Sequence, residues 1–66
     1  MRYEIRVSGV LREETRREGF PELESVTVPG QTMLFGDVVD EAHLYGLLRR
    51  FQVLGLTVTE LRRLPE

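Results

Sequence analysis

Four side chains that could bind a metal ion or transfer a proton lie close together in the chain: Asp37, Asp40, Glu41 and His43. A metal site needs three or more such groups converging on one point, and Asp40 and His43 could be neighbours on a helix. Helix capping is a simpler explanation, because aspartate is a favoured N-cap and glutamate suits the positive end of a helix. His43 lies about 100° from a buried stripe centred near Leu44, so we expect it to face solvent. We therefore predict no metal ion and no cofactor.

Catalytic groups are scarce elsewhere. The chain has no cysteine and a single histidine, which excludes a thiol nucleophile, a disulfide and a thiolate zinc site. Gly30 and Gly36 are typical of a turn and a strand, and they do not form a phosphate-binding loop. We predict that the chain is not an enzyme.

Length and charge indicate one small domain with an ordinary surface. The chain has 66 residues, a net charge of −2 and 30% charged residues, which does not favour binding to a polyanion. There is no apolar run of about 18 residues, and the alternating start of the chain is not a signal peptide, so we expect a cytoplasmic location and no membrane span. A core of this size rarely contributes more than about 3–5 kcal/mol, which makes self-association the expected extra stabiliser.

The order of elements predicts the fold. Period-two alternation from Tyr3 to Val7 predicts a strand, and a short helix over residues 10–19 follows, with Ser8 as its cap. Val10, Leu11 and Phe20 are the apolar anchors of this helix. The later elements are a strand at 23–28, a turn at Pro29-Gly30, a strand at 31–38, a helix capped by Asp40 that runs to about Leu54, and a strand opening at Leu56. This βαββαβ order predicts a ferredoxin-like α+β domain, a four-stranded antiparallel sheet with two helices on one face.

One face of the long helix is apolar. Its stripe contains Leu44, Leu47, Leu48, Phe51 and Leu54. The spacing is that of a helix packed on a sheet, so we expect the stripe, Leu48 included, to be core.

Two further surfaces carry unexpected residues. Met33 and Phe35 lie on the face of their strand opposite Leu34, so both faces of that strand are apolar. If Leu34 faces the helices, Met33 and Phe35 lie on the open sheet face, where large apolar side chains indicate a subunit contact. On the long helix, the side away from the stripe carries Ala42, Tyr45, Gly46 and Val53. A small-residue pair such as Ala42 and Gly46 makes a flat patch that another backbone could approach.

The chain resembles a group of very short bacterial proteins that carry no assigned function. The matching motifs are Ser8-Gly9, Thr32-x-Leu34-x-Gly36, the run from Asp40 to Leu48, and Leu54-Gly55-Leu56. The order of elements is also similar to that of ACT regulatory domains. That resemblance implies pairing through sheets or helices, and amino-acid binding at the loop after the first strand, where Ser8-Gly9 lies.

We expect a homo-oligomeric interaction or regulatory module, most simply a dimer, that contacts its partner through the two surfaces described above. An ACT-like sensor of a small metabolite is the alternative. RNA binding is a further alternative, since Tyr3 and Phe35 lie on the two strands that carry aromatic residues in RNA-recognition domains, but the charge does not favour it. A different protein partner remains open.

Overall fold

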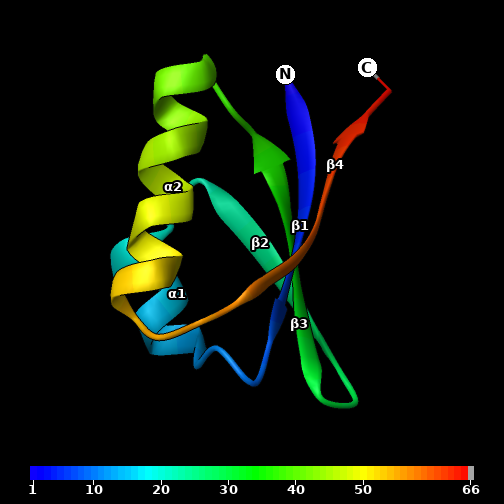
Figure 1. The fold of residues 1–66 in the computed structure, drawn as a ribbon, viewed down its shortest axis with the longest axis vertical. Helices are drawn as coiled ribbons and strands as arrows, with labels where there is room; N and C mark the ends of the chain where they lie inside the picture. Colours follow the sequence, from blue (N-terminus) through cyan, green and yellow to red (C-terminus); the bar gives the residue numbers. More distant parts are fainter. Residues whose placement is uncertain (66) are drawn as a thin grey trace.

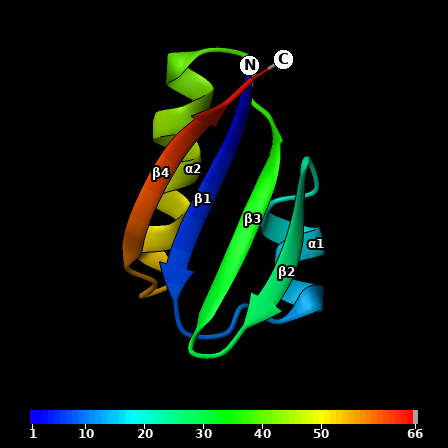
Figure 2. The same cartoon turned by 90° about the vertical axis from the view of Figure 1, so that its right-hand side faces the viewer.

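Four antiparallel strands form one sheet, and two helices pack on the same side of it (Figures 1 and 2). The computed structural model describes residues 1–65. The elements are β1 (Arg2–Ser8), α1 (Glu13–Gly19), β2 (Leu23–Val28), β3 (Gln31–Asp37), α2 (Glu41–Val53) and β4 (Val58–Leu64). The strands lie in the order β2-β3-β1-β4, so the predicted ferredoxin-like fold is confirmed.

The register of the central strand β1 decides which side chains face the helices. Ile5 of β1 lies opposite Leu34 of β3 and Leu61 of β4. Ile5 and Leu34 are fully buried, so these positions form the inner face, and the residues that alternate with them form the open sheet face. A bulge interrupts the pairing of β1 with β4 between Arg6 and Val7.

The core lies between the inner face and the helices. Phe20, just after α1, stacks on Phe51 of α2 with ring centroids 4.4 Å apart and planes inclined by 12°. The buried apolar residues are Ile5, Val7, Leu11, Phe20, Leu23, Leu34, Val38, Leu44, Leu47 and Phe51. No helix in the described part of the chain is long and apolar enough to cross a lipid bilayer.

The long helix α2 begins where the sequence predicts. The Asp40 side chain accepts a hydrogen bond from the backbone N–H of His43 at 2.9 Å, which confirms the predicted cap. Gly55 follows the helix with a φ of 76°, a conformation that favours glycine.

The apolar stripe of α2 is narrower than predicted. Leu44, Leu47 and Phe51 are buried, whereas Leu48 is only half-buried and Leu54 is 47% exposed. Leu48 lies about 100° around the helix from Leu47 and turns toward the edge strand β4, where one side of the helix remains open. Leu54 is the C-cap residue, one position beyond the last residue of α2.

The short helix α1 starts three residues later than predicted, and Ser8 does not cap it. Arg12 is the N-cap residue and makes no side-chain capping bond, while Ser8 ends β1 and donates its N–H to the carbonyl of Thr57. The loop from Gly9 to Arg12 is instead bonded to the β2–β3 hairpin, through Thr32. As a result Val10 is 65% exposed, and Leu11 is the buried anchor.

Candidate interaction surfaces

The open sheet face has an apolar half over β2 and β3. Met33 lies opposite Val26 of β2, and Phe35 follows Met33 on the same face. Met33 and Phe35 are half-buried, and Val26 is 48% exposed. The position predicted for Met33 and Phe35 therefore agrees with the register, and Val26 enlarges the apolar patch.

The other half of this face, over β1 and β4, is a belt of alternating charge. The Glu4 carboxylate lies 3.4 Å from Arg62 Nε and 4.0 Å from Arg6 Nε, and Arg6 Nε lies 3.7 Å from Glu60. Glu4 is only 8% exposed, although it lies on the face without helices. Its Oε2 and Arg6 Nε are shielded from solvent and make no hydrogen bond, so ion pairing is what balances them.

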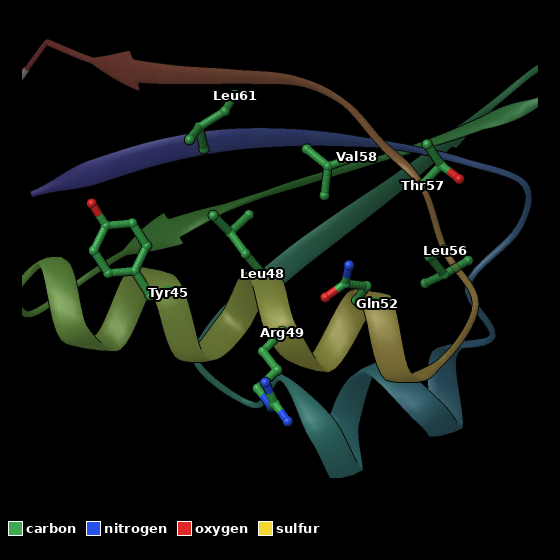
Figure 3. Close-up of a pocket in the computed structure, with 8 residues that line it drawn as sticks. All are labelled: Tyr45, Leu48, Arg49, Gln52, Leu56, Thr57, Val58 and Leu61. Atoms are coloured by element: carbon green, nitrogen blue, oxygen red, sulfur yellow. The ribbon is translucent and has the colours of Figure 1, made fainter.

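A groove runs between α2 and β4, on the side of the helix toward which Leu48 turns. Figure 3 shows Leu48 of α2 and Leu61 and Val58 of β4 pointing into the space between the two elements. Tyr45 and Gln52 of α2 form its helical wall, and its volume is about 640 Å³. Leu61 is 41% exposed and Tyr45 is 62% exposed, so the core is incomplete along this edge.

The residues of the predicted helix patch are all exposed on α2, and three of them line two different grooves. Tyr45 belongs to the groove beside β4, whereas Gly46 and Val53 line a second groove of about 420 Å³ between α2 and the end of α1. Ala42 is exposed on the helix surface. At 100° per residue, Tyr45, Gly46 and Val53 fall within about 100° of one another around α2, on the side away from the buried stripe.

The loop after β1, where the ACT resemblance implies a ligand site, closes on the hairpin. The Leu11 N–H donates to Thr32 Oγ1 at 3.1 Å, and the Thr32 hydroxyl donates to the Gly9 carbonyl at 3.0 Å. The Gly9 N–H donates to the Gly30 carbonyl. These backbone groups are therefore engaged within the chain.

His43 was predicted to face solvent, but its side chain is partly covered. Its side chain is 25% exposed, its Nδ1 accepts the Val39 N–H at 3.0 Å, and its Nε2 lies 3.7 Å from Glu22 of the segment before β2. The same Glu22 carboxylate lies 3.8 Å from Arg50. Within residues 1–65, no three His, Asp or Glu side chains are placed to hold a metal ion together.

The two aromatic residues considered for RNA binding lie on opposite faces. Tyr3 packs against the core, and Phe35 belongs to the open sheet face. A pair of stacking platforms on one surface therefore does not form.

Fold and surfaces together define a ferredoxin-like α+β domain with an amphipathic open sheet face and an unfinished edge at β4. Residues 2–62 match the family described as a domain of unknown function (DUF8691), and the chain belongs to that family. Comparison with curated proteins and with solved structures found no match.

Sequence reasoning missed the groove beside β4 and the burial of Glu4. Leu61 stands alone between charged residues, and only the knowledge that β4 is an edge strand makes it conspicuous. Glu4 belongs to an alternating strand and looks like an ordinary solvent-facing residue until Arg62, far away in sequence, is placed beside it.

Proposed function

We propose that this domain is a small homo-oligomeric interaction module without catalytic activity, and that its open sheet face is the contact surface. The observation that carries the proposal is the patch of Val26, Met33 and Phe35 on a face that no helix covers. Large apolar side chains grouped on one exposed face are typical of protein contact sites. We propose a cytoplasmic location for this activity.

A second copy is the partner that the patch suits best. Two-fold stacking of the open faces can set the apolar half of each copy against that of the other, while the charged belt of Glu4, Arg6 and Arg62 stays toward the rim. Interfaces commonly combine an apolar centre with a polar rim. Covering Met33 and Phe35 also adds to the stability of a domain with a small core.

The double change Met33→Lys with Phe35→Glu tests the proposal. Light scattering at several protein concentrations should show a lower molar mass than for the native chain, and thermal denaturation should show a lower Tm. The matched control is Val10→Lys with Val39→Glu, which places the same two charges on loop positions that are 65% and 81% exposed.

The control should keep the native molar mass. A native chain that is monomeric at every concentration would refute the proposal, as would an unchanged mass in the Met33 and Phe35 variant.

An ACT-like metabolite sensor is the alternative that the resemblance suggests. Hydrogen bonds with Thr32 already engage the backbone of the loop after β1, where the sensor would bind its ligand. The sensor is therefore less well supported than self-association through the open sheet face. A rise in Tm on adding individual amino acids would favour the sensor.

A further inference from the structure

We propose that β4 pairs antiparallel with β4 of a second copy about a two-fold axis through Leu61, which joins the two four-stranded sheets into one. The inference rests on the proposed homo-oligomeric function and assigns it a second contact, distinct from the open sheet face. It is drawn from the edge position of β4, its charge pattern and the groove behind it.

The two edges of the sheet differ in how they are protected. At β2, the Arg16 guanidinium donates a hydrogen bond to the Leu23 carbonyl, so a side chain of α1 covers the beginning of that edge. At β4, the bulge affects only the start of the strand, and the pairs Glu60 to Arg6 through Leu64 to Arg2 are regular. A regular edge strand is a template for pairing with another strand.

Charge selects one register of self-pairing. Glu60 and Arg62 lie on the open sheet face, and Leu61 between them lies on the inner face. When both copies keep their helices on the same side, pairing centred on Leu61 places Glu60 of each copy opposite Arg62 of the other. The contact therefore contains two such pairs of opposite charge. A register centred on Glu60 or on Arg62 would place like charges opposite each other, which destabilises a strand pair.

The existing ion pairs extend across such a contact. Arg6 lies beside Glu60, and Glu4 lies beside Arg62, in each copy. Side chains of Glu60 and Arg62 remain 47% and 61% exposed, so both can take a further partner. Pairing therefore turns two separate charged belts into one belt of alternating sign.

The inner face gains as well. Leu61 meets the second copy's Leu61 at the axis, where directly opposite Cβ atoms lie about 4.5–5.5 Å apart. Because Leu61 is 41% exposed at the mouth of the groove with Tyr45 and Leu48, this contact covers the edge at which the core is incomplete. The open faces of both copies stay free for stacking through Met33 and Phe35, so the two contacts are compatible.

Charge exchange tests the register. Glu60→Arg alone and Arg62→Glu alone each place like charges opposite each other, and we expect a roughly 10- to 100-fold rise in the dissociation constant of this contact. The double variant Glu60→Arg with Arg62→Glu should restore association, as should mixing the two single variants. If the charges acted only through the ion pairs within one copy, Glu60 with Arg6 and Arg62 with Glu4, the double variant would break both pairs. Association would then stay weak in the double variant instead of being restored.

Single cysteines give an independent readout, since the chain has none. Leu61→Cys should form a disulfide-linked dimer under oxidised glutathione, because the two sulfur atoms approach at the axis. Arg63→Cys, on the same face, is the matched control. Its two copies lie roughly 13 Å apart along the strands and should not link.

Equal linking of both cysteine variants, or association that none of the charge variants alters, would overturn the β4 contact. If the native chain self-associates and only the Met33 and Phe35 variant reduces its mass, the proposed function stands and the β4 contact fails. If the native chain is a monomer at every concentration, both fail.

Discussion

Gly46→Ala is expected to stabilise the fold. Gly46 lies inside α2, where glycine costs about 1 kcal/mol relative to alanine. A Cβ atom at this position would meet no atom within 4 Å outside the helix backbone, so nothing opposes the gain. For a domain of this size, about 1 kcal/mol corresponds to a rise in Tm of about 4–8 °C.

Thermal denaturation followed by circular dichroism measures this change, at one fixed protein concentration because self-association also raises Tm. Gly36→Ala is the matched control on β3. A Cβ atom there would lie 2.6 Å from the Glu22 carbonyl oxygen and 3.1 Å from a methyl carbon of Leu23, so the strand must shift. We expect a loss of about 1–3 kcal/mol.

A Gly46→Ala protein with a lowered Tm would refute this reasoning. It would mean that the space beside Gly46 is occupied in solution, and that the helix surface with Val53 is itself a contact for another chain. An unchanged molar mass together with a raised Tm would remove Gly46 from the candidate interface.

Three other predictions follow from side chains with distinct surroundings. Leu47→Ala should cost about 3–5 kcal/mol because Leu47 is fully buried, whereas Leu48→Ala should cost about 1–2 kcal/mol; urea denaturation that ranks them the other way would contradict the helix orientation. Thr32→Val should cost about 1–3 kcal/mol in the same assay, since it leaves a buried backbone N–H without its acceptor. The hydrogen bond from Arg16 holds the pKa of the Glu13 carboxyl below its ordinary value of 4.5. A lowered folded-state pKa stabilises the fold above pH 4.5, and this contribution is lost as the pH falls through the folded pKa; an NMR titration of Glu13 that shows an ordinary or raised pKa would contradict the contact.

The parts of the fold that were predictable are those with local causes. Alternation marks β1, and Asp40 caps α2 through an N–H only three residues away. The errors come from contacts distant in sequence. Ser8 looked like a helix cap, but Thr32 holds the loop beyond it against the hairpin. Leu48 fits the helical stripe, and only the placement of α2 relative to β4 leaves it half-buried.

The candidate surfaces were also predictable only where their causes are local. Met33 and Phe35 could be assigned to one face because strand periodicity is strict. That Tyr45 lines the groove beside β4 while Gly46 and Val53 line the groove beside α1 could not be foreseen, because it depends on which element flanks each side of α2.

The pairing of β1 with β4 also has a consequence for the order of folding. The β2–β3 hairpin joins residues close in sequence, whereas Arg2 meets Leu64 only after almost the whole chain has closed into a loop. Closing so long a loop costs entropy before any contact compensates for it, so we expect β4 to dock last. In an isolated copy it should then also be the first strand to detach, since within the chain it pairs with one neighbour and buries few side chains. At a dilution where the copies are dissociated, amide hydrogen exchange should be faster in β4 than in β1 or β3, and a chain that has just lost this strand exposes the edge of β1.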